Sequence, residues 1–238
     1  MGVHHLTGEE KGTIEIPIIA EDNHLLVVEK PPNLLSQGDR TGDPDLLTLL
    51  KQDLKERYQK PGNVYLGLVH RLDRPVGGVM VFAKTSKAAA RLSEQIRTGK
   101  LMKTYLAVVH GRPKPQGRLV HYLVKERRTN TVRAVGKDTK GAKEAILDYE
   151  VLDWREGLSL VKIQLHTGRP HQIRVQLATI GCPLFGDQRY GGSLSKVGQQ
   201  LALWSHQIGL IHPTLRDQRV FTSYPHRTTF PWNNFVFD

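Results

Sequence analysis

One aspartate lies in a loop whose composition favours an ionised carboxylate. The segment His70-Arg71-Leu72-Asp73-Arg74-Pro75 joins two apolar stretches, 64–69 and 78–83, that we expect to be strands. Arginines on both sides would keep the Asp73 carboxylate charged, and a charged carboxylate can act as a nucleophile. The same pattern is also typical of a turn residue held by a surface salt bridge. Rigid strands on either side would allow the loop to aim Asp73 into a binding site.

Tyr105 and Arg174 are two further groups that could take part in chemistry. Tyr105 lies in the strand expected over residues 101–109, where a buried ring with a satisfied hydroxyl is the usual role. Arg174 follows Ile173, which begins the apolar stripe of an expected helix. An arginine at the edge of such a stripe commonly covers the core with its aliphatic part. Taken separately, neither residue identifies a function.

Several common catalytic motifs are absent from the sequence. It contains no G-x-x-x-x-G-K-[ST] phosphate loop, no H-E-x-x-H zinc motif and no G-x-S-x-G nucleophile elbow. The segment Tyr190-Gly191-Gly192-Ser193 is interpreted as a turn. Cys182 is the single cysteine and the 11 histidines are scattered, which disfavours zinc. An enzyme built on this sequence would use carboxylate, phenol and guanidinium groups, so we expect neither a metal nor a cofactor.

The spacing of apolar residues predicts an α+β protein. Helices are expected over about 45–59, from an N-cap at Ser86 to a stop at Gly99, and from Pro170 to Gly181. Strands are expected over residues 14–19, 24–29, 64–69, 78–83, 101–109, 118–125, 131–135, 144–153, 158–166, 200–211 and 218–224. Strands that outnumber helices and connect mostly by turns favour a mixed, largely antiparallel central sheet with flanking helices.

The domain organisation is expected to be simple. Residues 1–13 are polar and aperiodic, which predicts an N-terminal tail. No Pro/Gly/Ser-rich linker divides residues 14–238, so we expect a single domain there. No apolar stretch is long enough to span a bilayer, and the first residues lack a secretory signal. We therefore expect a cytoplasmic protein without membrane association.

The charge of the chain points to a polyanionic partner. Its 238 residues carry 34 Lys and Arg against 23 Asp and Glu, a net charge of +11. Excess positive charge repels itself in the folded state, so nucleic acid is the first partner to consider. A basic surface without a binding role is the alternative. Aromatic residues make up only 7% of the chain, which favours contacts to the backbone of folded RNA or DNA over base stacking on single strands.

Three segments together resemble the RluA-type family of RNA pseudouridine synthases, over about residues 18–225. They are His70-Arg71-Leu72-Asp73, the Lys103-Thr104-Tyr105 segment that runs to Gly111, and Gly168-Arg169-Pro170-His171-Gln172-Ile173-Arg174. They occur in the family's order and at compatible distances. Lys30-Pro31 and the segment from Gly181 to Asp187 match its flanking motifs. The resemblance implies the pseudouridine synthase catalytic fold, with a cleft between two lobes.

The resemblance also implies a reaction that needs no metal or cofactor. The N-glycosidic bond of a uridine in RNA breaks, the base rotates, and it is rejoined through C5. Asp73 would be the catalytic nucleophile or the stabiliser of the sugar intermediate. Tyr105 would stack on the base and move protons, and Arg174 would pair with Asp73 and keep it anionic.

Substrate contacts are implied for further residues of the same segments. Arg71 would fill the space left by a flipped nucleotide, since a base must leave its stack to reach the carboxylate. The remaining substrate-binding residues implied by the resemblance are His70, Arg169, His171 and Gln172.

The chain departs from the family pattern at a few places near these motifs. Asn33, Gln37, Val76, Gly77 and Gln176 replace residues that are frequent in the family. An S4-like RNA-binding domain, which many relatives carry, is not seen before the motifs. We therefore expect tRNA to be slightly favoured over rRNA as the substrate, and we expect a monomer.

Two other functions remain as alternatives. A non-catalytic RNA-binding or ribosome-assembly protein on the same scaffold would keep all function in an Asp73→Asn variant. A hydrolase or nuclease that uses Asp73 would need a metal or a water-activating partner, and the sequence shows neither.

Overall fold

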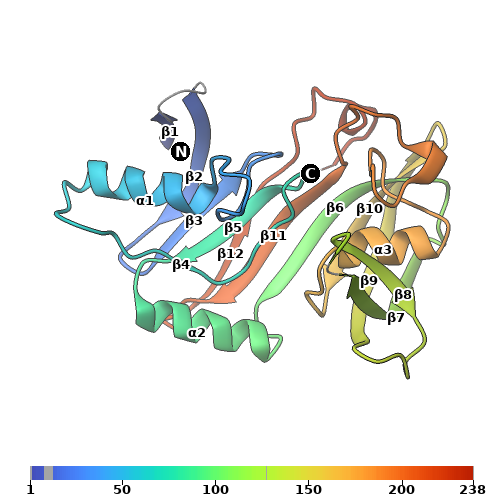
Figure 1. Cartoon of the computed structure of the whole chain (residues 1–238). Helices are drawn as coiled ribbons and strands as arrows, with labels where there is room; N and C mark the ends of the chain where they lie inside the picture. The colour runs from blue at the N-terminus through green and yellow to red at the C-terminus, as the bar shows by residue number, and fades with distance from the viewer. Residues whose placement is uncertain (1, 8–12, 127, 238) are drawn as a thin grey trace. The chain divides into compact units, whose positions relative to one another are not determined.

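The chain forms two compact units in a computed structural model that describes residues 2–7, 13–126 and 128–237. Unit 1 comprises Met1–Leu101 and Ser205–Ser223, and unit 2 comprises Met102–Trp204 and Tyr224–Asp238. The described part of the chain holds three α-helices and a larger number of strands (Figure 1), which confirms the predicted α+β class. No helix among these residues is long and apolar enough to cross a bilayer.

The strands of unit 1 follow the order β1-β2-β3-β5-β11, with β4 beside β5 and β12 beside β11. The pairs β1–β2, β2–β3, β3–β5, β4–β5 and β11–β12 are antiparallel. The bounds are β1 Gly2–Thr7, β2 Thr13–Glu21, β3 Leu25–Lys30, β4 Gly67–Leu68, β5 Gly77–Ala83, β11 Leu203–Ile211 and β12 Gln218–Thr222.

Two elements of unit 1 differ from the sequence-based expectation. Residues 2–7, predicted as part of a tail, form β1 and pair with β2; residues 1 and 8–12 lie outside the described part. The backbone of this strand pairs with β2, and such pairing leaves no mark in the polarity pattern. The strand expected over 64–69 shrinks to β4. Since β3 pairs along one edge of β5, β4 and β11 must share the other edge.

Two capped helices complete unit 1. Helix α1 spans Leu46–Arg57, and the Asp45 carboxylate accepts a hydrogen bond from the Thr48 N–H at 3.0 Å. Helix α2 spans Ser86–Arg97 and is capped by Thr85, one residue before the predicted cap. The chain then leaves α2 through Gly99, whose φ of +69° suits glycine, as predicted for the helix end. Apolar residues of α2 and β5 form one buried cluster. This packing fixes β5, the strand that directly follows the Asp73 loop along the chain.

Unit 2 is an antiparallel sheet in the order β6-β10-β9-β7-β8. The bounds are β6 Met102–His110, β7 Gln116–Glu126, β8 Thr131–Val135, β9 Lys143–Arg155 and β10 Leu158–Leu165. Helix α3, Gln172–Thr179, lies against β7 and β8 (Figure 1), and the short 3₁₀ helices are η1 Gly192–Leu194 and η2 Trp232–Asn234.

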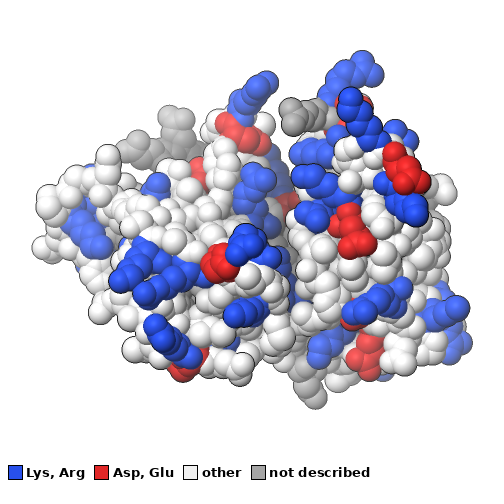
Figure 2. All heavy atoms as spheres, turned by 90° about the horizontal axis from the view of Figure 1, so that it is seen from below, with Lys and Arg blue, Asp and Glu red and all other residues white. Residues whose placement is uncertain are grey.

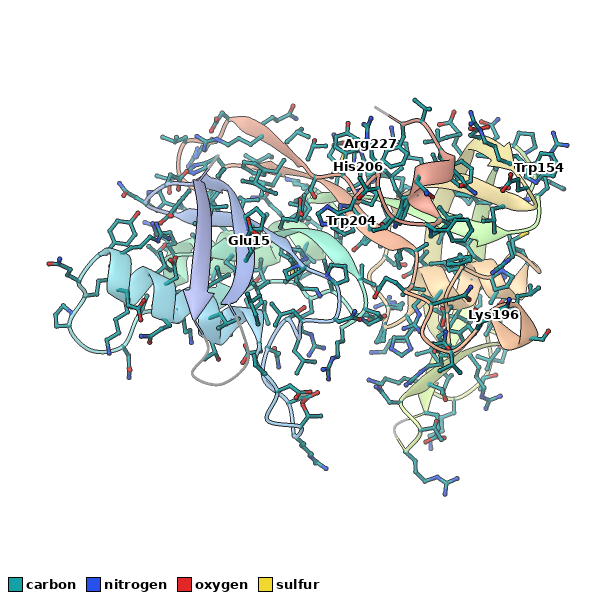
Figure 3. The ribbon with its side chains drawn as sticks, turned by 90° about the horizontal axis from the view of Figure 1, so that it is seen from above. Glu15, Trp154, Lys196, Trp204, His206 and Arg227 are labelled. Atoms are coloured by element: carbon teal, nitrogen blue, oxygen red, sulfur yellow. The ribbon has the colours of Figure 1, made fainter. Side chains whose placement is uncertain are left out.

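The two faces of the unit 2 sheet have different coverings. On one face Ala145 of β9 packs against Val175 of α3. On the other face Leu106 and Val108 of β6 pack in a cluster with C-terminal aromatic residues. Trp204, labelled in Figure 3, belongs to that second cluster. Since side chains alternate along a strand, Tyr105 lies on the α3 face.

Helix α3 begins two residues later than predicted. His171, with φ 51° and ψ 20°, precedes the first helical residue, Gln172. Every residue from Gln172 to Leu177 is buried, in contrast to the single apolar stripe expected. Arg174 is therefore enclosed, and its side chain does not lie at a solvent edge.

Candidate active site

The loop that carries Asp73 is fixed from two sides within unit 1. Ser36 Oγ donates to the Leu72 carbonyl at 2.8 Å and accepts from the Leu72 N–H at 3.1 Å. On the other side of Asp73, the Lys30 ammonium donates to the Arg74 carbonyl at 3.1 Å. Both neighbours of the half-buried Asp73 are thus held, so its carboxylate starts from a defined backbone position.

Lys30 is a fully buried cation at the end of β3. Its ammonium also donates to the carbonyls of Pro31 at 3.0 Å and Leu34 at 2.7 Å, so three acceptors match its three N–H groups. Burial lowers the pKa of Lys30 to about 7; the negative charge of Asp73 opposes this shift and the positive charge of Arg74 adds to it. The lysine links β3 to the Asp73 loop through backbone contacts.

The other polar residues of this loop differ in their contacts to the protein. His70 Nε2 accepts a hydrogen bond from the Val81 N–H at 3.0 Å, which ties the loop to β5. Arg74 donates to the Asn33 carbonyl at 3.1 Å and to Asp43 at 2.7 Å. Arg71 is exposed. His70 and Arg74 therefore support the loop, and Arg71 faces solvent.

Arg174 of unit 2 is held by a carboxylate that the sequence did not reveal. Its Nε donates to Asp187 Oδ2 at 2.8 Å and its Nη2 to Asp187 Oδ1 at 2.7 Å. Asp187 Oδ1 also accepts the N–H groups of Arg189 and Tyr190 at 3.0 and 3.1 Å. Burial would raise the pKa of Asp187, but the hydrogen bonds and charge of Arg174 outweigh it and hold that pKa below its usual value. The predicted pairing of Arg174 with Asp73 stays a prediction.

Tyr190 connects Arg174 to His171. The Arg174 guanidinium carbon lies 5.1 Å from the centre of the Tyr190 ring, within cation–π range. The Tyr190 hydroxyl accepts from the Val132 N–H at 2.9 Å and lies 2.7 Å from His171 Nδ1. The hydroxyl therefore links the Val132 backbone to the His171 ring. The segment interpreted as a plain turn thus contributes to the site.

The loop between β10 and α3 is fixed to β9 by buried polar contacts. The Thr167 hydroxyl accepts from the Ile146 N–H and donates to Gln172 Oε1, both at 2.8 Å. Gln172 Oε1 also accepts from the Arg169 N–H, and Nε2 donates to the Ile146 carbonyl at 3.1 Å. Both ends of the buried Gln172 amide are used inside the protein, and the substrate contact implied by the resemblance stays a prediction. The Arg169 side chain donates to the Glu144 carbonyl at 2.8 Å.

Tyr105 is buried on the α3 face of the unit 2 sheet. It lies opposite Ile163 of β10, which in turn lies opposite Tyr149 of β9. This register places an aromatic ring on the same face as α3, the helix that carries Arg174. Tyr105 was predicted correctly as a strand residue.

The arrangement offers a carboxylate on a fixed loop, and a guanidinium and a phenol on one face of a rigid sheet. A family model described as RNA pseudouridylate synthase matches residues 24–179, which include Asp73, Tyr105 and Arg174. The chain belongs to this family. Its enzymes are isomerases, and the chain is an RNA pseudouridine synthase.

Individual relatives of the chain are also named as pseudouridine synthases. The chain is 33% identical over 214 residues to "Uncharacterized RNA pseudouridine synthase YhcT" of Bacillus subtilis, covering 89% of this chain and 68% of that protein. It is also 33% identical over 214 residues to "Ribosomal large subunit pseudouridine synthase D" of Zymomonas mobilis, covering 86% of this chain and 67% of the relative.

A solved structure shows the same fold. The structure named "Human RNA Pseudouridylate Synthase Domain Containing 4" matches with a TM-score of 0.75 and 26% sequence identity, covering 89% of each chain. The predicted pseudouridine synthase fold is confirmed by this match.

The surface of the synthase carries the excess of positive charge that the composition requires. On the face shown in Figure 2, Lys and Arg side chains clearly exceed Asp and Glu. A basic surface suits the phosphate backbone of RNA.

Proposed function

We propose that this enzyme isomerises a specific uridine of a structured RNA to pseudouridine, with Asp73 as the catalytic nucleophile. The observation that carries the proposal is the backbone support on both sides of Asp73, from Ser36 to Leu72 and from Lys30 to Arg74. Such support holds a reacting group close to its productive position. A carboxylate whose only role was a surface salt bridge would not require two buried side chains to fix its neighbours.

The chemistry needs one nucleophile and a transfer of one proton. The Asp73 carboxylate attacks C1′ of the uridine ribose, and the bond from C1′ to N1 breaks with its electron pair moving to the base. The base rotates, and C5 displaces the carboxylate from C1′. The proton on C5 is then lost and N1 gains a proton, so that product and substrate are isomers.

Tyr105 and Arg174 complete the proposed catalytic set. Tyr105 stacks on the target base and moves a proton during the isomerisation. Arg174 keeps the Asp73 carboxylate ionised, which the nucleophilic step requires. Its guanidinium is suited to this role because Asp187 and Tyr190 fix its orientation before substrate arrives.

The proposed substrate contacts come from the exposed or half-buried polar residues of the two motif loops. Arg71 fills the space left by the flipped nucleotide, and Arg169 and His171 contact the RNA backbone. His70 and Gln172, whose polar atoms bond to the protein, act by shaping these loops. We place the enzyme in the cytoplasm and propose that it acts as a monomer.

The proposed substrate is a tRNA or an rRNA, with tRNA slightly preferred. The Zymomonas mobilis relative carries the large ribosomal subunit in its name, which makes rRNA the alternative to test first. The test incubates the enzyme with unmodified tRNA transcripts and with transcripts of both large rRNAs. Pseudouridines are then mapped by carbodiimide modification and primer extension. One strong stop at a single uridine of one RNA supports the proposal; RNA binding without any new stop on either class contradicts it.

A further inference from the structure

Lys103, the lysine of the Lys103-Thr104-Tyr105 segment, lies on the same face of strand β6 as Tyr105. The two residues are separated by one position on β6, and they pair with Leu165 and Ile163 of β10. Both therefore face α3, the helix that carries Arg174. Unlike Tyr105, Lys103 has no part in the proposed chemistry.

The Lys103 ammonium is a half-buried cation without a protein partner. Across residues 2–7, 13–126 and 128–237, it makes neither a hydrogen bond nor an ion pair. Two other lysines with little exposure do have partners: Lys30 bonds to three carbonyls, and the Lys84 ammonium lies 2.6 Å from Glu21 Oε1. Burial lowers the pKa of Lys103, and no charge among the described groups opposes that shift. A cation in this state costs free energy, which an arriving anion would offset.

The Lys103 ammonium lies beside an exposed glycine of the loop between β10 and α3. Lys103 Nζ lies 3.3 Å from the place where a Cβ would stand on Gly168, so it sits against the loop between β10 and α3. Gly168 is exposed, and the contacts of Thr167 and Gln172 to Ile146 fix the loop around it. The glycine leaves room at Nζ that a larger residue would reduce.

We propose that Lys103 binds a backbone phosphate of the RNA next to the target uridine. This inference rests on the proposed function, because the substrate of that reaction brings the phosphate. A phosphate oxygen beside Nζ would supply the missing charge partner and the missing acceptors at once. Because β6 and the fixed loop hold Lys103 in place, its contact with the phosphate would set how deeply the uridine enters next to Tyr105.

Three variants separate this role from a purely structural one. Lys103→Met removes the charge with little change in volume, and Lys103→Arg keeps a cation. Lys162→Met is the matched control, because Lys162 is an exposed lysine of β10 that pairs with Leu106 on the opposite face of the same sheet. RNA affinity is measured by filter binding at several salt concentrations, with the RNA on which wild-type enzyme forms pseudouridine. The rate is measured in single turnover at saturating enzyme.

The proposal predicts a loss of affinity for Lys103→Met of about tenfold, as expected for one charge-assisted contact. The dependence of log K on log salt should become shallower by about one. The saturated rate should change less than the affinity, and Lys103→Arg should recover most of the binding. The melting temperature of the free Lys103→Met protein should rise, because the unpaired cation is gone.

Other results overturn the proposal. Wild-type affinity and salt dependence in Lys103→Met would show that Lys103 binds no phosphate. A lower saturated rate with unchanged affinity would assign Lys103 to proton transfer. A lower melting temperature together with the weaker binding would make its role structural. Failure of the proposed function would be seen separately, as absence of pseudouridine with the wild-type enzyme.

Discussion

Asp187 holds the Arg174 guanidinium in a buried, two-bond ion pair, with donor–acceptor distances of 2.7 and 2.8 Å. The Arg174 side chain is 9% exposed and that of Asp187 is not exposed. Two parallel hydrogen bonds fix the plane of a guanidinium, which a single contact cannot do. The backbone N–H groups of Arg189 and Tyr190 fix the carboxylate in turn. Asp187 is therefore a positioning residue for Arg174.

Removing the Asp187 carboxylate should damage both stability and catalysis. Asp187→Ala leaves a buried guanidinium without its partner, which typically costs about 3–5 kcal/mol. Urea unfolding should show this loss, and the single-turnover rate should fall by at least roughly tenfold, a loss of about 1.4 kcal/mol in transition-state stabilisation. Asp153→Ala, which breaks the exposed pair with Arg155, is the control and should change neither quantity measurably. Equal effects of the two substitutions would refute the positioning role.

The Asp187 carboxylate should also shape the acid limb of the stability profile. Its pKa is lowered in the folded protein, because the hydrogen bonds and charge of Arg174 outweigh the opposite effect of burial. The stabilisation is then complete above the ordinary pKa of an aspartate and is lost as pH falls through the lowered value. Unfolding free energies from pH 7 to pH 2 should fall less steeply in Asp187→Asn than in wild type. Parallel acid limbs would contradict this assignment.

Lys30 should affect the rate more than the affinity for RNA. In Lys30→Met the carbonyls of Leu34 and Arg74 lose their donor, and the support on one side of Asp73 disappears. The saturated rate should drop while the RNA dissociation constant stays within about twofold, a change of about 0.4 kcal/mol. Lys55→Met, an exposed change on α1, serves as the control. Wild-type rates in Lys30→Met would show that the buried lysine does not position the loop.

The same lysine gives stability a characteristic pH dependence. Burial lowers the pKa of Lys30 to about 7, against 10.5 for an ordinary lysine. Between these values the unfolded chain binds more protons than the folded one, so stability rises with pH. The free energy of unfolding of wild type should therefore increase relative to that of Lys30→Met as the pH is raised from 7 towards 10. A constant difference over this range would rule out a lowered pKa.

Tyr190 allows its ring and its hydroxyl to be tested separately. Tyr190→Phe leaves the Val132 N–H without its acceptor, a loss of about 1–3 kcal/mol in stability, and it removes the hydroxyl contact of His171 Nδ1. The aromatic face 5.1 Å from the Arg174 guanidinium remains. Differential scanning calorimetry should detect the destabilisation, whereas the rate should decrease less than in Asp187→Ala. A rate as low as that of Asp187→Ala would mean that the hydroxyl network is what orients Arg174.

The sequence revealed the residues of the motifs but not the residues that hold them. Asp73, Tyr105 and Arg174 were chosen as candidates from their segments, and the predicted strand around Tyr105 is present. The links from Ser36 to Leu72 and from Lys30 to Arg74 join positions 36 and 44 residues apart. Spacing along the chain does not indicate which backbone carbonyls a lysine or a serine will reach. Lys30 was noted only as part of a flanking motif.

Asp187 and Tyr190 were missed for a related reason. Both follow α3, and both reach Arg174 because the chain folds back on the helix. Tyr190 begins the segment that was interpreted as a turn, and Asp187 was noted only as the end of a flanking motif. The signal that could have found Asp187 was its position in the flanking motif, together with the need of an enclosed arginine for a carboxylate. Arg174 was expected at the edge of the apolar stripe, next to solvent, where an arginine does not need a carboxylate partner. Strand β1 escaped prediction because its pairing with β2 leaves no mark in the polarity pattern.

The most direct test of the account compares wild type with Asp73→Asn in one assay, the release of tritium from RNA labelled at C5 of uridine. Breaking the C5–H bond is required for pseudouridine and for neither hydrolysis nor RNA binding. We expect stoichiometric release by wild type and none by Asp73→Asn, with the variant still folded and still binding the RNA. Release by Asp73→Asn at a rate near that of wild type would contradict the role of Asp73 as the nucleophile.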